Sequence, residues 1–173
     1  MSDDASIHAS AVRVGDRAVL IRGPSGAGKS RLAFDLIVAG RAGQIPEAVL
    51  VGDDRVHLDL RDGRLMVRPA EALEGLIEIR GLGIRRCAYV REAWVGLVVD
   101  LAAADAERLP PPEALAIEIF GAKLPRIPIA TGFSPLPIVV AALTTTESSS
   151  SVNLSDRCVK GIGNHIHPTI ATE

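Results

Sequence analysis

The chain has 173 residues, of which 47% are hydrophobic, 23% are charged and only 3% are aromatic. A formal net charge of −2 and so few aromatic side chains argue against a nucleic-acid-binding protein, which needs a basic field or side chains that stack on bases. A chain of this length is typical of one domain that buries its core without disulfides or structural metals.

The hydrophobic pattern predicts a strand, a loop and a helix in the first quarter of the chain. Residues 18–22 (AVLIR) form an apolar run typical of a buried strand, and a glycine-rich turn follows directly. From Gly28 to about Ala39, apolar residues recur at helical spacing, and Gly40 is expected to end the helix. Residues 48–52 (AVLVG) predict a second buried strand, which should lie beside the strand at 18–22.

Strands dominate the rest of the chain. Apolar and polar residues alternate over 56–60 and continue over 65–67, and the Asp-Gly pair between these segments predicts a β-hairpin. Residues 93–101, 115–119 and 124–129 are further strand candidates. One helix among several strands predicts an α/β fold whose sheet is mixed.

The composition changes near the end of the chain. From Thr144 the sequence begins TTTESSSS and continues as a polar segment, a composition typical of disorder. We therefore expect a functional domain over residues 1–143 and a disordered polar tail over residues 144–173.

A phosphate-binding pattern, G-x-x-x-x-G-K-S, spans Gly23, Pro24, Ser25, Gly26, Ala27, Gly28, Lys29 and Ser30. Its glycines let backbone N–H groups surround a polyphosphate, and the helix that follows presents the positive end of its dipole. Lys29 is expected to reach the β- and γ-phosphates, and the Ser30 hydroxyl is expected to bind Mg²⁺. A strand before the loop and a helix after it favour phosphate binding over a glycine-rich turn without a ligand.

Three carboxylates are candidates for the chemistry beside this loop. Asp53 and Asp54 follow the strand at 48–52, and either can hold Mg²⁺ or accept the proton of an attacking hydroxyl. On an extended segment the two side chains point in opposite directions, so each is expected to have its own role. Glu78 lies between two isoleucines on a predicted strand, which indicates a buried carboxylate that binds a metal or pairs with a neighbouring arginine.

In combination, these motifs resemble the catalytic domain of the HPr kinase/phosphorylase family. The resemblance rests, in chain order, on IHASAV with His8, GPSGAGKS, GDDRV, LIEIRGLGI and Glu107-Arg108-Leu109, and it covers roughly residues 6–140. That family phosphorylates a serine of the phosphotransferase-system carrier HPr and also removes the phosphate. The resemblance implies an α/β fold of the HPr kinase/PEP carboxykinase type, with a P-loop nucleotide-binding core and a mixed β-sheet.

The resemblance also implies roles for particular residues. Lys29 would bind the transferred phosphate, and Ser30 would hold Mg²⁺ with Glu78 as the second metal ligand. Asp54 would accept the proton of the substrate serine and would return it in the reverse reaction. ATP and Mg²⁺ are the cofactors that this assignment implies.

The resemblance alone adds two candidate active-site residues, and it shows one segment in which this sequence differs from the family. His8 and Arg108 match active-site positions of the family, and Arg108 would supply stabilising positive charge during phosphoryl transfer. The family segment linked to dephosphorylation is PVRPGR, whereas residues 128–133 are PIATGF and contain no arginine. We therefore expect weaker binding of inorganic phosphate and a weakened reverse reaction, which would release pyrophosphate.

The expected partners are an HPr-like carrier protein, ATP and, for the reverse reaction, inorganic phosphate and pyrophosphate. The resemblance implies a homo-oligomer, a hexamer, and a short form of the family without its usual N-terminal domain. The acidic start MSDDASIHAS has no signal-peptide pattern, and no apolar run approaches the ~20 residues of a membrane span. We therefore expect a cytoplasmic protein without membrane insertion.

Two other functions are compatible with the phosphate loop. One is a small-molecule kinase or nucleotide hydrolase, which would turn over nucleotide without a carrier protein. The other is a nucleotide-sensing regulatory module without catalysis. The sequence motifs decide neither the carrier, nor an effector, nor a preference for ATP over GTP.

Overall fold

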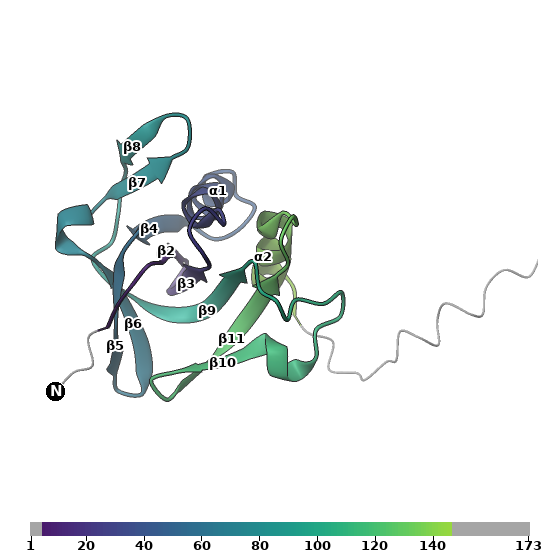
Figure 1. Ribbon diagram of the computed structural model, residues 1–173. Coiled ribbons are helices and arrows are strands. Elements are labelled where there is room, and N and C mark those ends of the chain that lie inside the picture. The colour runs from purple at the N-terminus through teal and green to yellow at the C-terminus, as the bar shows by residue number, and fades with distance from the viewer. Residues whose placement is uncertain (1–4, 147–173) are drawn as a thin grey trace, which may run out of the picture.

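The computed structural model describes residues 5–146 (Figure 1). One large sheet is formed by β1 (Ala5–Ile7), β2 (Ser10–Val14), β3 (Arg17–Arg22), β4 (Ala48–Gly52), β5 (Val56–Arg61), β6 (Arg64–Pro69), β9 (Ala93–Leu101), β10 (Ala116–Ile119) and β11 (Ala122–Ile129). The other elements are the hairpin of β7 (Leu76–Ile79) and β8 (Gly83–Arg86), helices α1 (Lys29–Arg41) and α2 (Pro135–Thr144), and two short 3₁₀ turns, η1 (Glu71–Leu73) and η2 (Pro112–Leu115). Parallel and antiparallel pairs occur in the same sheet, so the predicted α/β fold with a mixed sheet is confirmed.

The long strand β9 joins the parts of the sheet because it pairs with three other strands. β3 runs parallel to it along one edge. Along the other edge, β6 pairs antiparallel with Ala93 and Trp94, and β11 pairs parallel with residues 98–101. The sheet therefore forks between Trp94 and Val98, and Figure 1 shows β6 and β11 diverging from β9.

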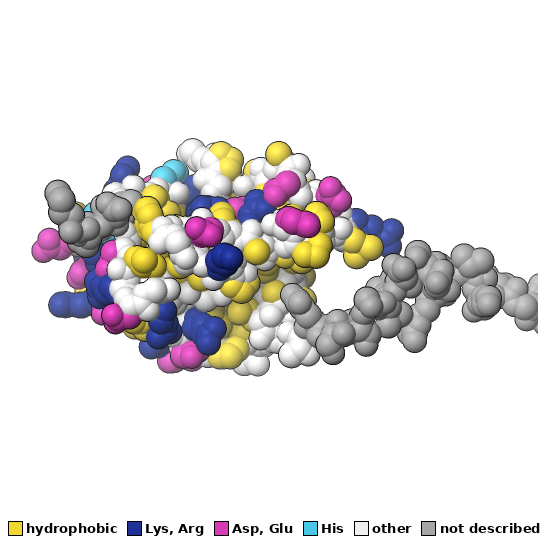
Figure 2. Space-filling model, turned by 90° about the horizontal axis from the view of Figure 1, so that it is seen from below, with side chains coloured by type: hydrophobic (Ala, Val, Ile, Leu, Met, Phe, Trp, Pro, Cys, Tyr) yellow, Lys and Arg dark blue, Asp and Glu magenta, His cyan; other side chains and the backbone are white. Residues whose placement is uncertain are grey.

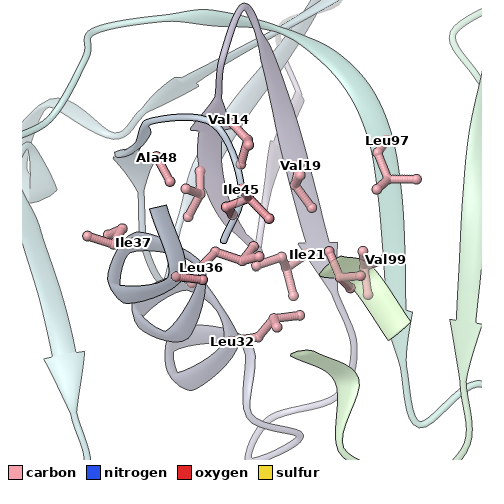
Figure 3. Packing of buried hydrophobic residues seen from close by; sticks show 14 of the residues in the cluster. Val14, Val19, Ile21, Leu32, Leu36, Ile37, Ile45, Ala48, Leu97 and Val99 are labelled. Atoms are coloured by element: carbon pink, nitrogen blue, oxygen red, sulfur yellow. The ribbon is translucent and has the colours of Figure 1, made fainter. Parts of the chain in front are cut away.

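Alternate side chains of β3 contribute to two separate cores. Val19 and Ile21 pack on the side of α1, where Leu36 is fully buried (Figure 3). Ala18 and Leu20 pack on the opposite face with apolar residues of β5, β6 and β9. Because β3 is buried on both faces, its sequence is a continuous apolar run rather than an alternating one.

The hairpin predicted at 56–67 is confirmed as β5 and β6. Asp62 and Gly63 form its two-residue loop with φ values of 51° and 73°. Positive φ at both loop residues is what the favoured two-residue hairpin turn requires, and Asp-Gly is a preferred pair for it.

β2 is a strand that the apolar pattern does not predict, and it changes the neighbours of β3. A tight turn at Gly15, where φ is 61°, folds β2 back onto the free edge of β3. β2 then pairs with β4 on its other edge. The expectation that residues 48–52 lie beside residues 18–22 is therefore wrong, because the local hairpin occupies that edge of β3.

Gly40 does not end the first helix, since α1 continues to Arg41. A Cβ atom at Gly40 would lie 2.8 Å from both the Cβ and the backbone nitrogen of Ala48. The glycine is therefore explained by the close approach of α1 to the start of β4. A pattern of helix-ending residues cannot distinguish these two uses of glycine.

Replacing Gly40 with Ala is expected to lower the free energy of unfolding by about 1–3 kcal/mol, the usual cost of overpacking. The neighbouring change Val38→Ala is the matched control, because Val38 is 46% exposed. We expect that control to stay within about 0.5 kcal/mol of the wild type. Urea unfolding of both variants measures the difference, and equal stabilities would contradict the packing argument.

The apolar pattern also does not predict α2, because two prolines lie in the first turn of this helix. Prolines are tolerated there since the first N–H groups of a helix have no partner within the helix. α2 packs beside α1 through the fully buried Val139.

Of the predicted tail, Thr144 is the last residue of α2, and residues 147–173 lie outside the described part of the chain. Neither described helix has the length and hydrophobicity needed to cross a membrane.

Candidate active site

The phosphate loop connects the end of β3 to the start of α1. Its glycines Gly23, Gly26 and Gly28 have φ values of 146°, 79° and 97°. A Cβ atom at Gly23 would lie 2.9 Å from the carbonyl oxygen of Leu101, so only glycine lets the loop approach β9 this closely. No side chain of the described residues caps α1 at Gly28, which leaves its first N–H groups available to an anion.

The side chain of Lys29, the first residue of α1, reaches back to the start of this loop. Only 5% of the residue is exposed, and its Nζ donates hydrogen bonds to the carbonyl oxygens of Gly23 and Pro24 at 3.0 Å each. Burial lowers the pKa of Lys29, and the negative charges of Asp53 and Asp54 act in the opposite direction. The buried cation is therefore within electrostatic reach of both aspartates. Ser30, the next residue, is half-buried in the first turn of α1.

Asp53, which follows β4, is a buried carboxylate that is hydrogen-bonded to both β2 and β7. It is 3% exposed, and its Oδ1 accepts a hydrogen bond of 2.5 Å from the Ser10 hydroxyl of β2. Its Oδ2 accepts a hydrogen bond of 3.0 Å from the backbone N–H of Glu78 on β7. Both carboxylate oxygens therefore have protein donors, and binding of Mg²⁺ by Asp53 would compete with them.

Asp54 points away from Asp53 because the backbone turns sharply between them. The N–H of Arg55 donates to the carbonyl oxygen of Asp53 at 2.8 Å, and φ of Asp54 is 66°. The expected extended conformation is therefore wrong, although the expected divergence of the two side chains holds. This three-residue turn is a strained conformation of the kind that occurs at functional sites.

The turn places the Asp54 carboxylate beside His8. His8 Nε2 lies 3.2 Å from Asp54 Oδ1, and the two side chains are 45% and 69% exposed. His8 follows β1, which pairs with β5 directly after the turn. The structure thus brings together two residues that lie at distant positions in the sequence and that were both predicted as site residues.

The structure places the other two predicted site residues, Glu78 and Arg108, at the surface. Glu78 is exposed on β7, so the expectation of a buried carboxylate is wrong, because the neighbouring Ile77 takes the inward face at 2% exposure. Arg108 is exposed in the segment between β9 and η2. Among the described residues, neither side chain has a polar contact with Lys29 or Asp54.

A network of four charged side chains beside the loop was not predicted from the sequence. Arg22, the last residue of β3, donates two hydrogen bonds of 2.8 Å to Asp100 on β9. Arg126 on β11 donates to the same carboxylate at 2.5 Å and to Asp105 at 2.6 Å and 3.0 Å. Asp105 lies in the segment that carries Arg108, so the network ties that segment to the residue before the phosphate loop.

The signal that could have found this network is the position of its charges. Arg22, Asp100 and Arg126 each lie in a strand whose other residues are largely apolar. Charged side chains inside a sheet must be paired. The sequence does not say which charge pairs with which.

Replacing Asp100 with Asn is expected to remove a pH-dependent part of the stability. Burial alone would raise the pKa of Asp100, but the hydrogen bonds and charges of Arg22 and Arg126 hold it below its ordinary value. A lowered pKa in the folded state stabilises the protein above the unfolded value of about 3.9, and this contribution is lost as the pH falls through the folded value.

The stability difference between wild type and Asp100→Asn should therefore be constant from about pH 5 to 8 and shrink below about pH 4. Urea unfolding at a series of pH values measures it. A difference that does not change down to about pH 3 would contradict the assignment.

The sequence matches a known protein family over most of its length. The model for the HPr Serine kinase C-terminal domain matches residues 1–156. The chain belongs to this family. The resemblance inferred from the sequence motifs is thereby confirmed.

Similar proteins of known name agree with the family. HPr kinase/phosphorylase of Mycoplasma mycoides is 30% identical over 164 residues, which are 87% of this chain and 50% of that protein. HPr kinase/phosphorylase of Streptococcus salivarius is 31% identical over 163 residues, which are 82% of this chain and 48% of that protein. The chain thus spans about half the length of the curated relatives it matches.

A solved structure agrees with the fold as well. The Hpr(Ser) kinase/phosphatase from Coxiella burnetii matches with a TM-score of 0.63 and 27% sequence identity. The match covers 80% of this chain and 93% of that chain. The predicted HPr kinase type of fold is therefore confirmed, and the roles of the individual site residues stay predictions.

Proposed function

We propose that this chain is an ATP-dependent protein-serine kinase that phosphorylates a serine of an HPr-like carrier protein. One observation carries the proposal: the buried phosphate-loop lysine, Lys29, begins α1, which packs against β4, and the turn after β4 presents the exposed Asp54 carboxylate to His8. A phosphate-binding group and a proton acceptor therefore occupy one site. Membership of the HPr serine kinase family supports this reading of the site.

The loop has the properties that a bound triphosphate requires. The uncapped start of α1 and the glycines offer backbone N–H groups, and Lys29 would exchange its two carbonyl partners for phosphate oxygens. Ser30 and Glu78 would hold Mg²⁺. No three His, Cys, Asp or Glu side chains of residues 5–146 gather as a metal-binding group, and Mg²⁺ bound with a nucleotide needs only one or two protein oxygens. When bound, the metal neutralises charge on the phosphates.

Asp54 would act as the general base. Its exposed side chain can meet a serine hydroxyl presented by another protein, accept the proton and so activate the oxygen for attack on the γ-phosphate. His8 would hold the carboxylate in position, and Arg108 would add positive charge near the transferred group. In the reverse reaction, Asp54 would return the proton while inorganic phosphate accepts the phosphoryl group. We expect this reaction to be weak without arginines in residues 128–133.

The first test incubates the protein with Mg²⁺, γ-labelled ATP and an HPr-type carrier. Label should appear on a carrier serine, and Lys29→Met should reduce its rate by at least ~100-fold, because the loss removes charge stabilisation of the transferred phosphoryl group. Arg41→Met, an exposed change at the far end of α1, is the control and should leave the rate unchanged. Full transfer by Lys29→Met would overturn the proposal.

Further measurements separate the alternatives. Nucleotide turnover that does not depend on a carrier would favour a small-molecule kinase or nucleotide hydrolase. Binding of nucleotide without transfer would favour a sensing module. Addition of phosphate to the labelled carrier tests the reverse reaction through release of pyrophosphate. The hexameric assembly and the cytoplasmic location also stay predictions, which sedimentation and fractionation would test. Nucleotide competition would measure whether the loop binds ATP or GTP more tightly.

A further inference from the structure

A cavity of about 420 Å³ lies at the end of β3 opposite to the phosphate loop. It is lined by Arg17, Gly63, Arg64, Leu65, Val95, Ala122, Lys123 and Leu124. Arg17 begins β3 and the loop follows its end, so the two sites are separated by six residues of extended strand, about 20 Å at ~3.3 Å per residue. None of the residues that line the cavity belongs to the candidate active site.

The fork in the sheet creates this cavity. β6 leaves β9 after Trp94 and β11 joins it only at Val98, so the strands diverge around Val95. The floor is apolar and comes from all three strands: Leu65, Val95, Ala122 and Leu124 are 1%, 6%, 6% and 9% exposed. Figure 2 shows the molecule from this side, where Lys and Arg side chains lie among apolar and acidic ones.

Three cationic side chains, those of Arg17, Arg64 and Lys123, lie at the rim of the cavity. Packing holds the first two in place. A Cβ atom at Gly96 would lie 2.6 Å from Cδ and 2.8 Å from Cβ of Arg17, so the Arg17 side chain crosses β9 where β9 has no side chain. The Arg64 guanidinium lies 4.3 Å from the centre of the Trp94 ring, a cation–π contact. Ordered cations lose less conformational entropy on binding than free ones.

The positive charges at the rim lack strong partners. Arg17 approaches Asp16 at only 3.9 Å, and the Asp16 side chain is 91% exposed. Arg64 and Lys123 form no ion pair with another described residue, although Glu118 faces Lys123 across the β10–β11 pair. None of the described residues that line the cavity carries a carboxylate. Three cations around one apolar hollow repel each other, and a bound anion would relieve this repulsion.

We propose that this cavity binds a small organic anion whose phosphate or carboxylate group contacts Arg17, Arg64 and Lys123. The apolar part of the ligand would lie against Leu65 and Val95. The volume falls in the range of ~300–1,000 Å³ that is typical of small-molecule sites. The inference does not depend on the proposed kinase activity, because it uses none of the same residues.

The test is a titration of the isotope-labelled full chain followed by amide NMR. The probes are phenyl phosphate and benzoate, which separate the two anionic groups, and benzyl alcohol is the neutral control. A saturating non-hydrolysable ATP analogue blocks the phosphate loop. We expect saturable shifts at the amides of Gly63, Gly96 and Ala122 with the anionic probes only.

A double variant, Arg17→Met with Lys123→Met, should weaken binding at least about tenfold, as expected for the loss of charge-assisted hydrogen bonds. Methionine keeps an unbranched stem over Gly96, so the fold should be retained. The matched control is Arg85→Met with Arg86→Met, which also removes two charges, on the exposed β8, and should not change the affinity.

Three results would overturn the proposal. With the phosphate loop blocked, the absence of saturable shifts at Gly63, Gly96 and Ala122 would show that the anions do not bind in the cavity. An equal loss of affinity in the Arg85→Met, Arg86→Met variant would show non-specific attraction to positive charge. Equal binding of benzyl alcohol would show that the cavity selects apolar groups and not anions. Because the shifts are assigned by residue, failure of nucleotide binding and failure of this site are distinguishable.

Discussion

Replacing Asp54 with Asn should lower the rate of phosphoryl transfer to an HPr-type carrier by about 10²–10⁴-fold, the usual contribution of a general base. The change removes the group that would accept the serine proton, while the phosphate loop keeps its structure. Nucleotide affinity should therefore stay within about twofold, because Asp54 contributes to binding only through its charge. Single-turnover transfer and equilibrium titration with ATP measure the two quantities separately.

Asparagine is the informative substitution because of the backbone at this position. Asp54 has φ of 66°, a left-handed conformation that asparagine adopts far more readily than alanine. Asp54→Ala would add backbone strain to the loss of the base, and a fall in its melting temperature would reveal this. An Asp54→Asn variant with wild-type transfer would remove Asp54 from the mechanism, whatever the family resemblance implies.

Replacing Arg126 with Ala should cost about 3 kcal/mol of stability, the lower end of the range for breaking a buried charge pair, because Asp105 is partly exposed. Arg126 is 13% exposed and bonds two carboxylates and the carbonyl oxygen of Ala114. Its loss leaves Asp100 with Arg22 as its remaining partner and releases Asp105 and the segment that carries Arg108. Denaturant unfolding measures the first effect, and faster amide exchange in residues 102–109 measures the second.

Two further variants separate charge from geometry at this position. Arg126→Lys keeps the charge but cannot bond both carboxylates with a planar fork, so we expect an intermediate loss of stability. Arg31→Ala removes an exposed pair with Asp35 within α1 and should cost no more than about 0.5 kcal/mol. Equal stabilities for Arg126→Ala and Arg31→Ala would contradict a structural role for the network.

Local patterns explain which elements could be predicted from the sequence. The apolar run of β3, the glycine loop and the periodic face of α1 follow each other directly, and each has its own signal. β2 begins with the buried Ser10 and has a charged residue, Arg13, at its fourth position, so its apolar pattern is short. The order of strands in the sheet depends on which edge is free when strands meet, and no local pattern contains that information.

In the candidate site, too, local sequence patterns predict some residues, and long-range contacts determine the others. Lys29 and Ser30 belong to one contiguous motif, so the chemistry of the loop predicts them. The pairs Arg22–Asp100 and Arg126–Asp100 join residues that are 78 and 26 positions apart. The outward direction of Asp54 depends on a single left-handed residue, because Asp53 is held by Ser10 and the β7 backbone. These features require the three-dimensional arrangement.

The position of β9 has a consequence for the order in which the chain folds. On a ribosome, the β2–β3 hairpin, the phosphate loop and α1 emerge well before residues 93–101, which supply the parallel neighbour of β3. Until then, one edge of β3 is unpaired and Gly23 lacks the backbone of Leu101 against which it packs. The nucleotide loop therefore acquires its final shape only after β9 has been synthesised, and nascent chains that end before β9 should be targets for chaperones.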